Sequence, residues 1–229
     1  MSDEAARKRV AVLISGRGSN MSALIGAAMD PSYPAEIVAV LSNKPDVGGL
    51  ATAARYGIPA EGIDQRLFAD RTAHERALIE RLDAYRPDII CLAGYMRLLT
   101  PLFVGHYAGR MINIHPSLLP LFPGLHTHER VLEAGMRIHG CTVHFVTDDM
   151  DEGPIIAQAA ITVERGDTPD SLANRLLRAE HRLYPHALRL VADGTVRQDG
   201  GRAVTAESRS GTPRPATPTV LVAPDGRES

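Results

Sequence analysis

Three short runs of consecutive apolar residues, separated by segments with helical spacing, restrict this chain to few folds. The runs lie at residues 10–14, 37–41 and 89–93. Uninterrupted apolar runs of this length are typical of parallel strands that are buried on both faces. The intervening segments predict helices at residues 19–29, 47–56 and 72–85. This alternation predicts an α/β fold in which helices cover both faces of a mostly parallel, twisted, Rossmann-like sheet.

The second half of the chain departs from this alternation. A further apolar strand is predicted at residues 110–114, and a short helix at residues 126–136. Two longer strand patterns follow at residues 139–147 and 155–163, joined by a hairpin or wide loop, so we expect antiparallel strands here. A long helix at residues 168–193 begins with a Thr-Pro pair and ends before a glycine.

Domain organisation follows from composition. We expect one folded domain at residues 9–198, preceded by a short N-terminal extension at residues 1–8. Residues 199–229 contain four Gly, four Pro and no aromatic residue, with a brief apolar patch at residues 220–222. Such a segment buries too little apolar surface to offset its conformational entropy. It is therefore predicted to be a mostly disordered tail.

The charge balance excludes some classes of function. The 229 residues have a net charge of −2, which gives no electrostatic reason to expect nucleic acid or an anionic membrane as a partner. No apolar run is long enough to span a bilayer, and the first nine residues do not resemble a signal peptide. Cys91 and Cys141 lie inside apolar strand patterns, which favours buried free thiols in the cytoplasm over a disulfide between them.

A carboxamide and an imidazole at one strand end are the best candidates for catalysis. Asn113 and His115 are two residues apart, so their side chains project from the same face of a strand. In acyl transfer, an amide donor stabilises the developing oxyanion and an imidazole moves a proton. Asp151, from a distant loop, would orient the imidazole and favour its charged form. An isolated histidine is more often structural, but the in-phase Asn113 and the polar loop favour catalysis.

A glycine-rich turn at residues 16–20 joins the first strand to the first helix. Small residues there let backbone N–H groups approach a phosphate at the helix N-terminus. The dinucleotide fingerprint needs a third glycine where Met21 stands, and no Gly-Lys-Ser/Thr sequence completes a P-loop. The turn therefore predicts a single phosphate group, although a tight turn without a ligand stays open.

The nine histidines do not suggest a metal site. His126 and His128 have no cysteine or acidic partner at a recognised ligand spacing, and they would point apart on a helix. No metal is therefore expected. His144, near the end of a predicted strand, is more readily interpreted as structural than as catalytic.

Several motifs in order resemble one enzyme family. They are Gly-Arg-Gly-Ser-Asn at 16–20, Ala-Gly-Tyr-Met-Arg-Leu-Leu at 93–99, Asn-Ile-His-Pro-Ser-Leu-Leu-Pro at 113–120, Phe-Pro-Gly-Leu-His-Thr-His at 122–128, His-Phe-Val-Thr-Asp at 144–148 and Asp-Glu-Gly-Pro at 151–154. From about residue 9 to about residue 196, the chain resembles the phosphoribosylglycinamide formyltransferases, which use folate in purine biosynthesis. A glutamate at position 152, where a small residue is more usual, is a small departure.

The resemblance implies a reaction and a role for each matching residue. The amine of glycinamide ribonucleotide would attack the formyl carbon of 10-formyltetrahydrofolate directly. Asn113 would donate to the oxyanion, His115 would carry a proton between the two nitrogens, and Asp151 would hold His115 charged. The implied ribonucleotide contacts are Gly18, Ser19, Asn20 and Glu180. The implied folate contacts are Arg71, Met96, Arg97, Leu98, Leu99, Asn113, Thr147, Asp148, Asp149, Met150 and Asp151.

Three alternatives remain at this stage. Formyltetrahydrofolate deformylase shares the Asn-x-His and Asp residues, but it would have a further N-terminal domain and lack the Gly-Ser-Asn turn. Methionyl-tRNA formyltransferase would need a second folded domain and a basic surface for tRNA. A non-catalytic folate-binding protein would be favoured only by an altered catalytic set. Whether the protein is a monomer or a homodimer is left open.

Overall fold

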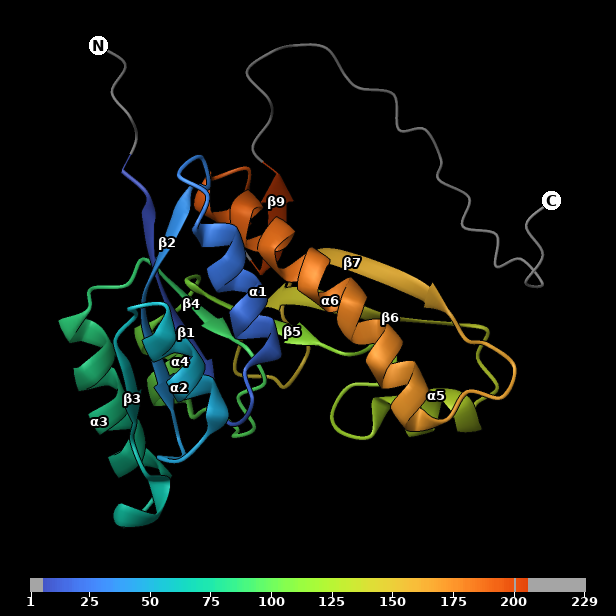
Figure 1. Ribbon diagram of the computed structural model, residues 1–229, viewed down its shortest axis with the longest axis horizontal. Helices are drawn as coiled ribbons and strands as arrows, with labels where there is room; N and C mark the ends of the chain where they lie inside the picture. Colours follow the sequence, from blue (N-terminus) through green and yellow to red (C-terminus); the bar gives the residue numbers. More distant parts are fainter. Residues whose placement is uncertain (1–5, 200, 206–229) are drawn as a thin grey trace.

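The computed structural model describes residues 6–199 and 201–205, which form a seven-stranded sheet flanked by helices and followed by a small hairpin (Figure 1). In chain order, the elements are β1 Lys8–Ile14, α1 Ser19–Ala28, β2 Ala35–Ser42, α2 Gly48–Arg55, β3 Ala60–Gly62, the 3-10 turn η1 Gln65–Leu67, α3 Arg71–Ala84, β4 Ile89–Leu92, α4 Pro101–His106, β5 Met111–His115, α5 Thr127–Glu133, β6 Ile138–Phe145, β7 Ile155–Thr162, α6 Pro169–Ala192, β8 Val196–Asp199 and β9 Arg202–Thr205.

The sheet has the order β3-β2-β1-β4-β5-β6-β7. The strands from β3 to β5 pair in parallel, whereas β6 and β7 are antiparallel additions. This confirms the predicted α/β fold with antiparallel strands in the C-terminal half. The strand order reverses between β1 and β4, and in open α/β sheets ligands bind beside the carboxyl ends of strands at such a point. The turn at residues 16–20 and the segment at residues 93–99 both leave strands there.

Strand β1 shows why helices cover both faces. Val10, Val12 and Ile14 pack into one core together with α1 and α6, while Ala11 and Leu13 pack into a second core with α3 and α4. Every one of these strand side chains is fully buried. A strand that is buried on both faces has an uninterrupted apolar sequence. This is the pattern that predicted β1.

Helix α6 is the longest helix and lies across the sheet (Figure 1). Thr168 caps its N-terminus in a reciprocal pair of hydrogen bonds with Ser171. Pro169, directly after Thr168, lies in the first turn. The buried Tyr184 hydroxyl lies 3.0 Å from the carbonyl oxygens of both Leu92 and Ile112, at the ends of β4 and in β5. Helix α6 is thereby fixed against the strands that carry the candidate site.

The helices and strands expected in the catalytic domain are present, most with ends within two residues of the prediction; the helix expected at residues 126–136 ends at Glu133. Both cysteines are buried free thiols, as expected. The short elements β3, η1 and α4 were not predicted, because three to six residues carry too little periodicity.

The C-terminal boundary needs correction. β8 and β9 form an antiparallel hairpin, with β9 in contact with β7, so the expectation of disorder is wrong for Asp199 and for residues 201–205. Residues 206–229, including the patch at 220–222, lie outside the described residues. Over the described ranges, no helix is both long and apolar enough to cross a membrane.

Candidate active site

Strand β5 delivers Asn113 and His115 to one place. The strand is otherwise apolar and buried, and it pairs with β4 on one side and β6 on the other. Across the antiparallel pair, Asn113 lies opposite His144 and His115 opposite Thr142. Asn113 and His115 therefore share one face of the sheet, as their spacing predicted.

The two ring nitrogens of His115 both face acceptors. Nδ1 lies 3.4 Å from Oδ2 of Asp151, and Nε2 lies 3.0 Å from the carbonyl oxygen of Phe122. A carbonyl accepts only from an N–H, so Nε2 carries a hydrogen here. The ring is only 6% exposed, so both contacts are made in a site largely shielded from water. The imidazole is thus held in one orientation by the predicted carboxylate and by a backbone carbonyl.

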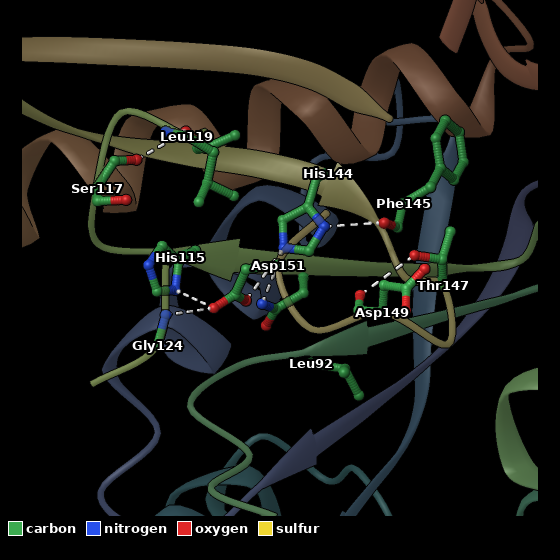
Figure 2. A network of polar contacts seen from close by, with 12 residues as sticks. Leu92, His115, Ser117, Leu119, Gly124, His144, Phe145, Thr147, Asp149 and Asp151 are labelled. Atoms are coloured by element: carbon green, nitrogen blue, oxygen red, sulfur yellow. Dashed lines mark hydrogen bonds and ion pairs between the residues drawn. The ribbon is translucent and has the colours of Figure 1, made fainter. Parts of the chain in front are cut away.

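Asp151 lies between the two histidines (Figure 2). Its Oδ2, besides facing His115, accepts a hydrogen bond of 2.8 Å from the backbone N–H of Gly124. Its Oδ1 lies 3.8 Å from Nε2 of His144. The backbone φ of Asp151 is +59°, a left-handed conformation that aspartate tolerates better than most residues. The loop is therefore built to present this carboxylate to His115.

His144 fixes the orientation of the Asn113 carboxamide. Its Nδ1 donates to the carbonyl oxygen of Phe145 at 2.8 Å, and burial lowers the pKa of the ring. A neutral ring with its hydrogen on Nδ1 has an acceptor at Nε2. Nδ2 of Asn113 lies 3.2 Å from this Nε2 and donates to it. The second hydrogen of the Asn113 amide is left for another acceptor, such as an oxyanion.

Gly153 allows the Asp151 loop to lie against β6. A Cβ atom at this position would stand 1.7 Å from the carbonyl oxygen of Phe145 and 3.3 Å from Nδ1 of His144. Only glycine permits this approach of one backbone to another. The loop that carries Asp151 is therefore docked on the strand that carries His144.

The glycine-rich turn forms the N-terminus of α1. Gly18 is the N-cap residue with φ +72°, and no side chain caps the helix. The first N–H groups of a helix have no intrahelical partner, so this end can accept an anion. Nδ2 of Asn20 donates a 2.7 Å hydrogen bond to Glu180 on α6, and burial raises the pKa of Glu180. The predicted Gly18, Ser19 and Asn20 are thus brought together with Glu180, which is 160 residues from Asn20 in the chain.

The residues expected to contact folate include several exposed apolar side chains. Met96 is 66% exposed, Leu98 is 56% exposed and Met150 is 54% exposed. Thr147 donates to the carbonyl oxygen of Asp149 at 3.3 Å, which shapes the loop before Asp151 (Figure 2). Arg71 is exposed at the first position of α3, and no contact to the other predicted site residues is seen for it.

Three groups in the site were not assigned from sequence. The Phe122 carbonyl and the Gly124 N–H are backbone groups, and only the Phe-Pro-Gly sequence marks a turn there. His144 was interpreted as structural, and the structure gives it a defined contact with Asn113.

His126 and His128 have separate partners, Glu129 and His139. Among the described residues, no group of three or more His, Cys, Asp or Glu side chains could hold a metal ion.

Comparison with known proteins now decides the family. The model of the formyl transferase family matches residues 8–188, which include every catalytic and ribonucleotide candidate. The chain belongs to the formyl transferase family. The phosphoribosylglycinamide formyltransferase of Escherichia coli strain K12 is 47% identical over 188 residues, covering 82% of this chain and 89% of that protein. This confirms the resemblance drawn from the motifs.

Solved structures and longer relatives agree with this assignment. The phosphoribosylglycinamide formyltransferase from Brucella melitensis is 57% identical, with a TM-score of 0.79 over 87% of this chain and 100% of that chain. The trifunctional purine biosynthetic protein adenosine-3 of Bos taurus is 52% identical over 83% of this chain, which spans 19% of that protein's length. A formyltetrahydrofolate deformylase from Pseudomonas syringae is 25% identical, with a TM-score of 0.80 over 88% of this chain and 66% of that chain.

Proposed function

We propose that this formyl transferase moves the formyl group of 10-formyltetrahydrofolate to the amine of glycinamide ribonucleotide, in de novo purine biosynthesis. The products would be formylglycinamide ribonucleotide and tetrahydrofolate. The observation that carries the proposal is the convergence of Asn113, His115 and Asp151 at the end of β5, on the same edge of the parallel strands at which helix α1 begins. A ribonucleotide and a formyl donor can then meet at the end of β5.

The chemistry follows from the contacts of these three side chains. The substrate amine attacks the formyl carbon, forming a carbon–nitrogen bond and a tetrahedral intermediate with a negatively charged oxygen. The free N–H of Asn113 donates to this oxygen. His115 carries a proton between the attacking amine and N10 of the folate, whose bond to the formyl carbon then breaks. Asp151 keeps His115 oriented and stabilises its charged form.

Substrate contacts are proposed for the remaining candidates. The ribonucleotide phosphate would bind at Gly18, Ser19 and Asn20, where helix α1 begins, and Glu180 would accept hydrogen bonds from the ribose hydroxyls. The folate would lie between two walls. Its proposed contacts are Met96, Arg97, Leu98, Leu99 and Asn113 on one wall, Thr147, Asp148, Asp149, Met150 and Asp151 on the other, and Arg71 near its acidic tail.

The second candidate function is hydrolysis of the same folate. It is favoured by the likeness to the deformylase from Pseudomonas syringae, and both reactions would use an oxyanion donor and a proton carrier. The Asn20–Glu180 contact beside the α1 N-terminus argues for a ribonucleotide acceptor instead, because hydrolysis needs no such site. A folate-binding protein without turnover would not need the Asn113, His115 and Asp151 arrangement.

One experiment separates these candidates. Purified protein is mixed with 10-formyltetrahydrofolate, with and without glycinamide ribonucleotide, and the appearance of tetrahydrofolate is followed. Consumption that depends on the ribonucleotide supports the transferase. Equal consumption in its absence means a hydrolase, and no consumption in either case favours a binding protein.

We further propose that the protein acts in the cytoplasm, as a monomer or homodimer, without a nucleic-acid partner.

A further inference from the structure

A closed ring of hydrogen bonds lies between the two proposed substrate subsites. Ser15, which directly precedes the glycine-rich turn, accepts from the backbone N–H of Met96 at 2.8 Å and donates to Oδ1 of Asn43 at 2.6 Å. Nδ2 of Asn43 donates to Oε1 of Gln65 at 2.9 Å. Nη1 of Arg97 donates to the same oxygen. Because Met96 and Arg97 are neighbours in the chain, the ring closes on the segment proposed as a folate wall.

The ring joins four separate pieces of the fold. Ser15 follows β1, Asn43 follows β2, Gln65 begins η1, and Met96 with Arg97 lies beyond β4. Ser15 is 6% exposed and Asn43 is 1% exposed. Each group in the ring has a fixed role as donor or acceptor, so a change at one member leaves a neighbour without its partner. The two buried members, Ser15 and Asn43, are therefore held rigidly by their hydrogen bonds, while Gln65 and Arg97 are half-buried.

The ring adjoins the phosphate turn, because Ser15 directly precedes Gly16 in the chain. The N–H of Ser15 donates to the carbonyl oxygen of Gly94 at 3.2 Å, and the N–H of Gly49 donates to that of Gly16 at 3.2 Å. Gly16 and Gly18 belong to the turn that begins α1, whereas Gly94 lies two residues before the folate wall at residues 96–99. Ser15 is thus joined covalently to the turn, and by hydrogen bonds to Gly94 and to Met96 in the folate wall.

We propose that Ser15, Asn43 and Gln65 are positioning residues that couple the two substrate subsites. The proposal rests on the function proposed above, because it assigns the ribonucleotide phosphate to the turn and the folate to the segment at residues 96–99. A phosphate bound at the turn fixes Ser15. The ring then holds Met96 and Arg97 in place, which lowers the entropy cost of ordering the folate wall. The ribonucleotide consequently strengthens folate binding, and the folate strengthens ribonucleotide binding by the same factor.

The coupling is measurable without turnover. Tetrahydrofolate has no formyl group to transfer, so its mixture with glycinamide ribonucleotide does not react. Anaerobic calorimetry gives the Kd of each ligand alone and with the other at saturation. For the unmodified protein, we expect both Kd values to fall by the same factor, at least about fivefold.

Matched variants test whether the ring transmits the effect. The coupling ratio is the Kd of one ligand alone divided by its Kd with the other ligand at saturation. In Ser15→Ala, this ratio is expected to fall below about twofold for both ligands, because Met96 and Asn43 lose their shared partner. Gln65→Leu removes the oxygen that accepts two hydrogen bonds and should behave in the same way. Gln65→Glu keeps that oxygen and should show the same ratio as the unmodified protein. Ser171→Ala, at the start of α6, removes a hydroxyl outside the ring and should leave the ratio unchanged.

The possible results are distinct. Equal Kd values with and without the second ligand in the unmodified protein would overturn the coupling and leave the proposed function standing. An unchanged ratio in both Ser15→Ala and Gln65→Leu would also overturn it. Failure of the unmodified protein to bind either ligand would overturn the proposed function and the coupling together. Circular dichroism checks that each variant is folded. If Ser15→Ala does not fold, the comparison of Gln65→Leu with Gln65→Glu decides the question, because Gln65 is only half-buried.

Discussion

Asn113 and His144 face each other across the β5–β6 pair, and the Asn113 amide nitrogen lies 3.2 Å from Nε2 of His144. This contact leaves one amide hydrogen of Asn113 available for the oxyanion. Removing an oxyanion donor typically lowers kcat by about 10²–10³-fold, which we expect for Asn113→Ala. His144→Leu keeps the amide and removes the ring that orients it and also faces Asp151, so we expect a smaller loss, about tenfold.

The double variant tests this division of roles by steady-state kinetics. If His144 acts through Asn113, the Asn113→Ala variant already lacks everything that His144 supports. The double variant should then be no slower than Asn113→Ala alone, because effects on residues in contact are not additive. A further tenfold loss in the double variant would show that His144 contributes independently of Asn113.

Asp151→Asn should nearly abolish turnover and leave substrate binding much less affected. The substitution keeps the shape of the side chain and suits the φ of +59°, but it removes the charge facing His115. We expect kcat to fall about 10²–10⁴-fold, as is typical when proton transfer is lost. Kd values for both substrates, measured by calorimetry, should change less than about threefold.

Glu152→Gln is the matched control, because Glu152 is an exposed carboxylate next to Asp151 in the same loop and is not among the proposed substrate contacts. It should retain most of the activity of the unmodified protein. An Asp151→Asn enzyme with near-normal kcat would show that the carboxylate does not serve His115.

The central residues of the site could be predicted because they obey a local rule. Asn113 and His115 lie in phase on an apolar strand, and the turn of residues 16–20 follows another such strand. Asp151 was placed in the site by its residue type and by the resemblance of its motif. Its approach to His115 depends on how the loop packs against β6, which no local pattern encodes.

What could not be predicted depends on backbone geometry and on register. The Phe122 carbonyl and the Gly124 N–H act through main-chain atoms, so their residue types give no chemical signal. The role of His144 follows from its place opposite Asn113, which requires the register of β5 and β6. The β8–β9 hairpin is mostly polar along its strands and so resembles a disordered segment in composition.

Gly153→Ala should disrupt both stability and activity. The added Cβ would overlap the Phe145 carbonyl, and backbone atoms cannot move aside as a flexible side chain can. The loop must shift, which separates Asp151 from His115. We expect a loss of about 1–3 kcal/mol in the free energy of unfolding, as is typical of overpacking, and a large fall in kcat.

Gly26→Ala provides the comparison for Gly153→Ala in urea unfolding and kinetic measurements. A Cβ at Gly26 meets nothing within 4 Å, and alanine favours the helical conformation of α1. This variant should be as stable as the unmodified protein or slightly more so, with unchanged kcat. Equal behaviour of the two variants would contradict the steric role of Gly153.

The His128–His139 pair should make the protein less stable in mild acid. Nδ1 of His128 lies 3.0 Å from Nε2 of His139, so one of the rings must be neutral to accept the hydrogen bond. Burial lowers the pKa of His139 to about 4, with smaller contributions from His128 and His115, and burial also lowers the pKa of His128 despite the nearby Glu129. Folding therefore favours the neutral rings.

The pH dependence follows from the proton balance of His139. Between pH 6.5, the ordinary pKa of histidine, and about pH 4, the unfolded chain binds a proton that the native state does not. Its contribution to stability is therefore complete above pH 6.5 and is lost as the pH falls toward 4. Urea unfolding at pH 7 and pH 5 should show a smaller loss in His139→Gln than in the unmodified protein. His186→Gln removes an exposed histidine of α6 and should lose as much stability as the unmodified protein. An equal loss in all three proteins would mean that the His128–His139 pair does not respond to pH.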